Sequence, residues 1–578
     1  PALRGEMAVE GRIRLCFSPF MRKSGKILWL FLILVLGVAS AHAEDKTMFR
    51  AREGASALLR GQYDKAITAY DEVLATPEIA DFVKAAAYSD RGVAKWRLKR
   101  TAEAVEDFNL SIQISPENAT VYNNRGNAVM DLGHPDEAAR DFDRAIALSP
   151  NYGAAYNNRG NARTALGQYE QAFHDFRKAT ELMPTSAVPF NGRGKAHAAL
   201  NRYHAAIRDF TRALNLNNKY ESALRNRGEA YLAVEKYDQA ADDFTQVLAA
   251  DPDQPDVLLL RARAYIAAKK FNPAQTDLDK VIEAKPELVD AFIERGILLT
   301  GVRRCAPAFV GLTHAIELDP KNVAAYAMLA SAKLQSGDKD GALQDVNAGL
   351  TVSPGDPVSL QIRGGIYEAQ ERTSDAIEDY KNVLSHDPFD TASRDALQRL
   401  GQEVPQEQGD ALAAPISGWV IKEPAKGRYI ASNPKYPSLR ADLEMFGSGK
   451  PKILEWTLLK DALAGIGLLR YYAGDLGDGQ GTSLEYVAIV DTYANKVVSI
   501  EPHAWGANAA QWNWQSISVV VTDPDGNSNE VKLRKPKIAR PVARDEGDFF
   551  GFGGQAEARG GGTRRGGRDN GAFNWLFR

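Results

Sequence analysis

A period of 34 residues organises most of this chain. Residues 122–150 nearly overlay residues 156–184 when one stretch is shifted by that distance. An Arg-Gly pair recurs in the same register, at 91–92, 125–126, 159–160, 193–194, 227–228, 295–296 and 363–364. A unit this short cannot bury an apolar face alone, so neighbouring units must stack to share one continuous core.

The residue types inside one unit predict two closely packed helices. Gly126 in the first helix and Ala138 in the second allow the helices to approach, and Phe142 fills the space toward the next unit. Pro150 ends the second helix, because proline lacks an N–H group and clashes with the preceding turn. The pattern resembles the tetratricopeptide repeat family over about 350 of the 578 residues. This resemblance implies an α-solenoid, and we expect ten repeats and a closing helix within residues 44–401.

The segment before the repeats has the features of a secretory signal. Basic residues precede an apolar run at 27–38, and Ala41-His42-Ala43 provides a small-x-small cleavage pattern. We therefore expect a signal peptide at 21–43, with residues 1–20 as a non-native upstream segment. The protein would be exported, and periplasmic in a Gram-negative source. An uncleaved N-terminal membrane anchor is the alternative. After cleavage only Cys305 remains, which excludes an intramolecular disulfide.

Most repeats carry an Arg just before the small residue, usually Gly, of the first helix and an Asp just before the aromatic position of the second. The Asp is replaced by Gly311 in the eighth repeat and the Arg by Leu329 in the ninth. Because the two losses fall in adjacent repeats, we expect the Asp of one repeat to pair with the Arg of the next. Such pairs stabilise the structure and are not catalytic.

Partner binding in such arrays occurs on the concave face formed by the first helices. In repeats three to six this face carries asparagines: Asn123, Asn124, Asn127, Asn157, Asn158, Asn161, Asn191 and Asn226. Asparagine offers a donor and an acceptor, so a ladder of them can hold an extended peptide backbone. The ladder resembles that of the superhelix of O-linked N-acetylglucosamine transferases. Alternatively, asparagine simply tolerates a solvated helix face.

The first helices of later repeats carry apolar residues instead. The predicted apolar groove consists of Leu259, Leu260, Ile293, Met328 and Ile362, and ordinary packing between helices is the alternative. A basic Gly/Arg tail at 535–578 ends in Phe573, Trp575 and Phe577, which we expect to dock in that groove. The tail resembles an RGG box. Behind a signal peptide, anionic envelope components or a simple tether fit better than nucleic acid.

Between the array and the tail the period changes from helical to alternating. After a linker at 402–415, residues 416–534 predict a small, mainly antiparallel β domain, so the fold class is α + β in separate domains. We expect strands at 419–421, 452–459, 467–472, 486–490, 496–500 and 516–522, and a hairpin turn at 523–527.

The β domain shows no recognisable catalytic arrangement. His503 is its one histidine, and no G-x-S-x-G nucleophile turn occurs. Asp475, Asp478 and Glu485 have the residue type of glycosidase carboxylates, but loop acids are usually solvated. Trp512 and Trp514 alternate onto one strand face, where they would stack on a sugar or a partner, or else join the core. We predict no catalytic residue, metal or cofactor.

The sequence therefore predicts an exported, non-enzymatic scaffold that binds a protein or peptide. One alternative is an envelope hydrolase or a polysaccharide-binding or -processing protein that uses the β domain. A second is nucleic-acid or anion binding by the tail, which would be local because the net charge is −3.

Overall fold

The computed structural model describes residues 43–77, 79–386 and 390–402 of the helical part. In the β domain it describes residues 417–425, 428–433, 435–446, 449–459, 465–476, 482–492, 496–514, 518–523 and 528–533. The upstream segment, the signal peptide apart from Ala43, the linker after residue 402 and the tail all lie outside these residues. Across the described helices, none combines the length and the hydrophobicity needed to cross a membrane.

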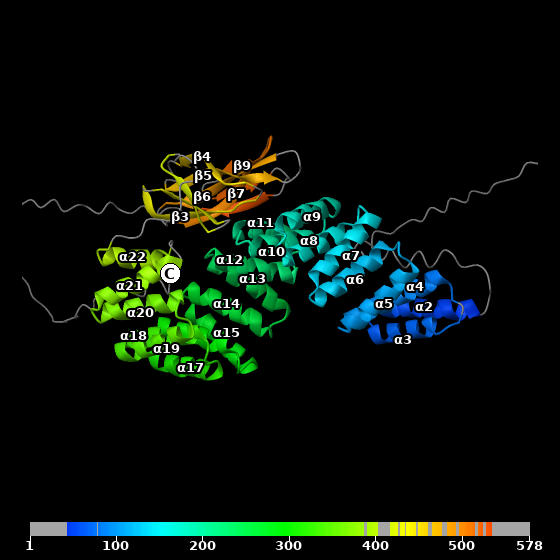
Figure 1. Cartoon of the computed structure of the whole chain (residues 1–578), viewed down its shortest axis with the longest axis horizontal. Coiled ribbons are helices and arrows are strands. Elements are labelled where there is room, and N and C mark those ends of the chain that lie inside the picture. Colours follow the sequence, from blue (N-terminus) through cyan, green and yellow to red (C-terminus); the bar gives the residue numbers. More distant parts are fainter. Residues whose placement is uncertain are drawn as a thin grey trace, which may run out of the picture. The chain divides into compact units, whose positions relative to one another are not determined.

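Helices in antiparallel pairs form the described residues from 43 to 399 (Figure 1). They are α2 Ala43–Leu59, α3 Tyr63–Leu74, α4 Asp81–Arg97, α5 Thr101–Ile114, α6 Ala119–Asp131, α7 Pro135–Leu148, α8 Gly153–Ala165, α9 Tyr169–Leu182, α10 Ala187–Ala199, α11 Tyr203–Leu216, α12 Glu221–Ala233, α13 Tyr237–Ala250, α14 Pro255–Ala267, α15 Phe271–Ala284, α16 Val289–Gly301, α17 Cys305–Leu318, α18 Val323–Ser336, α19 Lys339–Val352, α20 Pro357–Ala369, α21 Thr373–His386 and α22 Thr391–Arg399. Repeat one is α2–α3, repeat ten is α20–α21, and α22 closes the array. The predicted solenoid is therefore confirmed.

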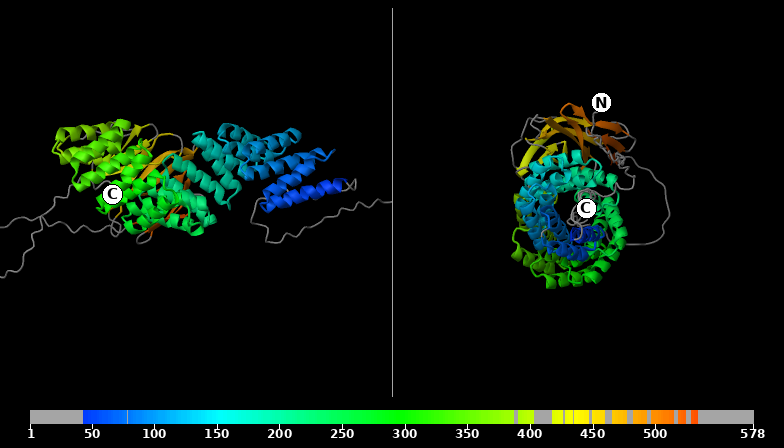
Figure 2. Two further views of the ribbon diagram at one scale, coloured as in Figure 1. Left: turned by 90° about the horizontal axis from the view of Figure 1, so that it is seen from below. Right: turned by 90° about the vertical axis from the view of Figure 1, so that its right-hand side faces the viewer.

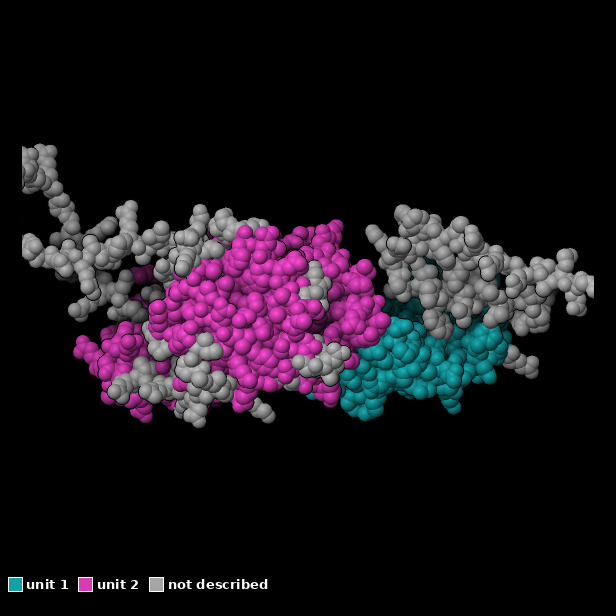
Figure 3. Space-filling model, turned by 90° about the horizontal axis from the view of Figure 1, so that it is seen from above, with its two compact units in different colours: residues 1–167 teal, residues 168–578 magenta. Residues whose placement is uncertain are grey.

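The chain divides into two compact units, residues 1–167 and 168–578 (Figure 3). The described part of the first unit contains α2 to α8. The second contains α9 to α22 together with the β domain.

Helix pairing depends on glycine and an aromatic residue in the same repeat. A Cβ atom on Gly126 of α6 would lie 2.7 Å from the Phe142 ring of α7, and one on Gly228 would lie 2.6 Å from Phe244. Both Phe rings are fully buried. Any side chain larger than glycine would therefore push the two helices of a repeat apart.

The recurring Arg–Asp pair forms within one repeat. The prediction that the Asp of one repeat pairs with the Arg of the next was therefore wrong. Arg227 Nε and Nη2 donate to the two carboxylate oxygens of Asp243 at 2.8 and 2.7 Å. The third nitrogen, Nη1, donates to Thr211 of the preceding repeat at 3.2 Å. The same in-repeat pair recurs as Arg91–Asp107, Arg125–Asp141, Arg193–Asp209, Arg261–Asp277 and Arg363–Asp379.

The two exceptional repeats use substitutes, which explains why the prediction failed. In repeat nine Lys333, one helical turn after Leu329, lies 2.7 Å from Asp345. In repeat eight Arg295 lies 3.8 Å from Asp279 of the preceding repeat. Asp345 and Arg295 therefore each have an oppositely charged neighbour. The absence of the usual Arg or Asp did not indicate which repeats pair with each other.

The β domain is antiparallel, as predicted. Its described strands are β1 Val420–Ala425, β2 Arg428–Asn433, β3 Tyr436–Leu443, β4 Lys452–Leu458, β5 Ile466–Leu476, β6 Thr482–Asp491, β7 Lys496–Trp505, β8 Asn508–Ala509, β9 Gln511–Trp514, β10 Ser518–Thr522 and β11 Ser528–Lys532. The sheets have the orders β1-β2-β3, β4-β5-β6-β7-β8 and β11-β10-β9. The pairing of Thr522 with Ser528 places the predicted hairpin between β10 and β11.

Two hydrophobic cores cover the five-stranded sheet. Leu469 and Tyr471 of β5 belong to a core shared with Trp419 and the β1–β3 sheet. Ile466 and Ile489 belong to a second core shared with the β9–β11 sheet. The five-stranded sheet is therefore the layer that both smaller sheets pack against.

Candidate partner-binding groove

The asparagines predicted to bind a partner join neighbouring repeats through their side chains. Asn158 Nδ2 of α8 donates to Asn123 Oδ1 of α6 at 2.9 Å. Asn226 Nδ2 of α12 donates to Asn191 Oδ1 of α10 at 3.0 Å. The structure thus brings the predicted residues together in two clusters, one in each compact unit. In both, an amide hydrogen bond connects the first helices of consecutive repeats.

The members of these clusters differ in burial. Asn123, Asn157 and Asn191, each 34 residues apart, are buried. The neighbouring residues are half-buried, and they are Asn124, Asn127, Asn158, Asn161 and Asn226. The half-buried amides keep part of their surface in solvent, where each further donor or acceptor can form a hydrogen bond worth about 1 kcal/mol. The buried members instead fix the positions of their neighbours.

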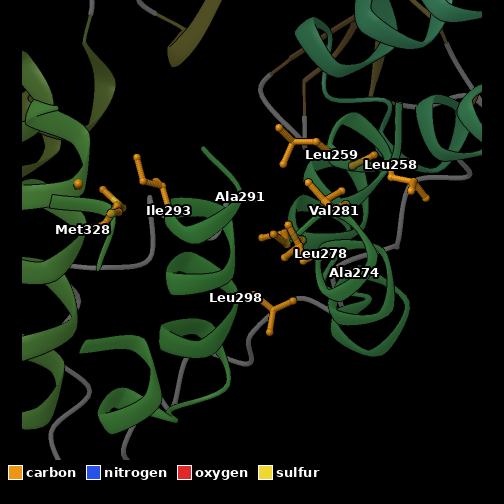
Figure 4. Packing of buried hydrophobic residues seen from close by; sticks show 14 of the residues in the cluster. Leu258, Leu259, Ala274, Leu278, Val281, Ala291, Ile293, Leu298 and Met328 are labelled. Atoms are coloured by element: carbon orange, nitrogen blue, oxygen red, sulfur yellow. The ribbon is translucent and has the colours of Figure 1, made fainter. Parts of the chain in front are cut away.

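The predicted apolar groove is mostly core. The exposed fractions of Leu259, Ile293, Met328 and Ile362 are 7%, 7%, 8% and 1%. Figure 4 shows three of them among the labelled side chains that fill the space between successive helices. Leu260 is only partly buried against the same core. Little apolar surface remains at these positions for a ligand.

Docking of the tail in the apolar groove stays a prediction, because Phe573, Trp575 and Phe577 lie outside the described residues.

The sequence analysis missed a change of chemistry along the same helix face. Arg263 of α14 occupies in repeat seven the place that Asn127 occupies in repeat three. Its guanidinium lies 2.6 Å from Glu294 and 3.0 Å from Asp290, both on α16. Burial raises the pKa of Glu294, and Arg263 opposes that shift. Ion pairs thus replace amides as the polar link between first helices, and the spacing of 34 residues was the signal for them.

His503 of the β domain lies beside the guanidinium of Arg470. Its Nε2 lies 3.3 Å from Nη1 of Arg470, which also lies 3.1 Å from Glu455 and 3.5 Å from Glu485. Burial lowers the pKa of His503, and the charge of Arg470 lowers it further. The carboxylate of Asp475 instead contacts Tyr472, whose pKa rises to about 12, mainly through burial. Asp478 lies outside the described residues.

The two tryptophans of β9 share one strand face, as predicted. The rings of Trp512 and Trp514 stack with centroids 5.8 Å apart and planes at 28°. Trp512 packs partly against the second core, whereas Trp514 is 38% exposed. Within the described part of the chain, no cluster of His, Cys, Asp and Glu side chains is arranged to hold a metal ion.

Comparisons with known proteins agree with the repeat architecture. Tetratricopeptide repeat models match residues 52–119, 123–187, 191–255 and 231–293. Three solved structures illustrate the similarity. A tetratricopeptide repeat protein from Parabacteroides merdae has 18% identity over 49% of this chain and 99% of its own, with a TM-score of 0.38.

YrrB, described as a TPR protein with an unusual peptide-binding site, has 24% identity over 32% of this chain and 96% of its own, with a TM-score of 0.28. Yeast Tom70 has 16% identity over 62% of this chain and 96% of its own, with a TM-score of 0.30.

Proposed function

The helical array of this chain is a tetratricopeptide solenoid, and we propose that it is a scaffold whose asparagine clusters each bind an extended protein segment. The observation that carries the proposal is the pair of hydrogen bonds Asn158–Asn123 and Asn226–Asn191. Each bond holds two amides in fixed positions across neighbouring repeats, one pair in each compact unit. Because each amide has both a donor and an acceptor, such a pair matches the alternating N–H and C=O groups of a peptide backbone.

This arrangement favours recognition of the backbone over recognition of a particular side chain. Rigid amides also reduce the entropy that binding must overcome, since their positions are set before the partner arrives. We assign the chain a binding role, and the proposal includes no catalytic step.

The test compares two triple variants of the full chain in a selection of random ten-residue peptides. The first changes Asn124, Asn158 and Asn226 to Ala. The matched control changes Gln171, Gln239 and Gln246, which are exposed amides on second helices, to Ala. We expect peptide enrichment on the wild type and the control but not on the asparagine variant. Equal enrichment on all three proteins would contradict the proposal.

Export is part of the same proposal and rests on the sequence of residues 21–43. N-terminal sequencing of the native protein should begin at Glu44. Retention of residues 21–43 would support the anchored alternative.

A further inference from the structure

The β domain contacts the solenoid at the second helix of repeat five, α11 (Figures 1 and 2). Glu444 follows β3, and its two carboxylate oxygens accept hydrogen bonds from the backbone N–H groups of His204 at 2.9 Å and Ala205 at 3.2 Å. These amides belong to the first turn of α11, whose own preceding residue, Arg202, forms no capping bond. Glu444 therefore caps a helix about 240 residues away in sequence.

A second contact lies one turn further along α11. The guanidinium of Arg208 lies over the rings of Phe446 and Tyr486, 5.6 and 5.5 Å from their centroids. These two rings stack on each other with centroids 3.9 Å apart. Arg208 thus gains a cation–π contact from the β domain while its charge stays near the acids of the interface.

Arg208 also covers an open edge of the sheet. Its Nη1 donates to the backbone carbonyl of Ile500 in β7, and it lies 4.0 Å from the buried carboxylate of Glu501. Among the described strands, the short strand β8 pairs with Ala504 and Trp505 on that side of β7, beyond Ile500. An uncovered edge strand invites pairing with other chains, and here a helix covers it.

The aromatic ring of Phe446 reaches α10 as well. The His197 ring lies between Phe173, with centroids 4.4 Å apart, and Phe446, at 5.9 Å. Burial lowers the pKa of His197, so this ring packs as a neutral group. Burial raises the pKa of Glu444 to about 7, and Arg208 and the two amide donors act against that shift.

We infer that repeat five carries a second recognition site, specific for a carboxylate followed two residues later by an aromatic ring, and that Glu444–Phe446 of the same chain occupies it as a releasable latch. The solenoid provides a helix N-terminus, an arginine and a histidine ring, and the β domain provides the matching acid and ring. The site is formed by α10 and α11 and does not depend on partner binding by the asparagines.

The polar character of the contact limits the free energy that holds the latch closed. Placing Glu444 and Arg208 in a buried site removes both from water, and this cost offsets much of their mutual attraction. Interfaces of this kind between domains resemble transient complexes more than permanent ones.

The experiment measures hydrogen exchange of the full chain in three variants. Glu444→Ala removes the cap and Arg208→Gln removes the contact with β7. Glu530→Ala is the matched control, because Glu530 is an exposed acid on β11. We expect Glu444→Ala to raise exchange at residues 204–205 about tenfold, as loss of a helix cap does. Arg208→Gln should raise exchange at residues 499–502, and the control should change neither region.

Two further results decide the inference. A synthetic peptide copying residues 442–447 should restore protection of residues 204–205 in Glu444→Ala, whereas the same peptide with Gln in place of its Glu should not. If Glu444→Ala also raises exchange in β5 and β6, the β domain itself is destabilised. In that case the test of the inference is the result for Arg208→Gln. The latch would be overturned if Arg208→Gln left exchange unchanged at both 204–205 and 499–502. It would also be overturned if the peptide had no effect on Glu444→Ala.

Discussion

Replacing Arg227 by Leu should destabilise repeat six by about 3 kcal/mol. The side chain of Asp243 is 3% exposed and would lose both N–H donors, which now lie at 2.8 and 2.7 Å. Removing one partner of a buried pair costs roughly 3–5 kcal/mol, because the other charge stays buried without compensation. The Arg227 side chain is 17% exposed, so solvent screens part of the pair and the lower end applies.

Repeat two provides the comparison. Its Asp107 is equally buried, but Lys95 Nζ lies 2.9 Å from the carboxylate in addition to Arg91. Arg91→Leu should therefore cost only about 1.5 kcal/mol, the value of charged hydrogen bonds lost while a counter-ion remains. The double change Arg91→Leu with Lys95→Met should restore a cost of about 3 kcal/mol.

The assay is the free energy of local opening from amide exchange in α12–α13 and in α4–α5. A local measurement is needed because solenoids do not unfold in a single transition. Burial already raises the pKa of Asp243 with Arg227 present, and loss of Arg227 raises it further. Because the pKa of Asp243 is higher in the folded state, folding is penalised when the pH is above that pKa. The stability lost in Arg227→Leu should therefore become smaller as the pH falls. Equal losses for Arg227→Leu and Arg91→Leu, or a deficit independent of pH, would refute the reasoning.

Two other predictions concern exceptional positions in the repeats. Gly311→Asp should stabilise repeat eight by about 1 kcal/mol, measured as slower amide exchange in α16–α17, because a Cβ there meets nothing within 4 Å and the acid gives Arg295 an in-repeat partner in addition to Asp279. Faster exchange in α16–α17 would show that the in-repeat pair does not form. Burial raises the pKa of Asp90 to about 6 although Tyr70 donates to it at 2.9 Å, so α4 should lose about 1 kcal/mol of stability as the pH rises through 6. Asp90→Asn should abolish this dependence in amide exchange between pH 5 and pH 8, and a dependence that persists would assign it to another group.

The repeat architecture could be predicted because its signals are local and recur. Gly126 and Phe142 are 16 residues apart, and the same spacing returns in Gly228 and Phe244. The charge register could not be predicted from missing partners, since Lys333 takes over the role of an absent arginine from the next turn. Periodicity also failed to separate groove from core at Ile362, because both faces of these first helices carry apolar residues.

In the β domain the strands without a sequence-based expectation are β2, β3 and β8. β8 contains only Asn508 and Ala509, which is too short to show any alternation of apolar residues. The contact between Glu444 and α11 gave no signal either. A single acid after a strand is ordinary in sequence, and only the fold places it at a helix N-terminus.

The separation between Glu444 and His204 has a consequence for biosynthesis. Each repeat can pack on the preceding one soon after it leaves the ribosome, because contacts between neighbouring repeats lie within a few tens of residues. At about 5–20 residues per second, Glu444 is translated roughly 12–48 seconds after His204. During that interval the backbone N–H groups of His204 and Ala205 lack the carboxylate of Glu444 as an acceptor. Other acidic segments can bind them in the meantime. The order of translation thus makes repeat five the last part of the solenoid to reach its final state.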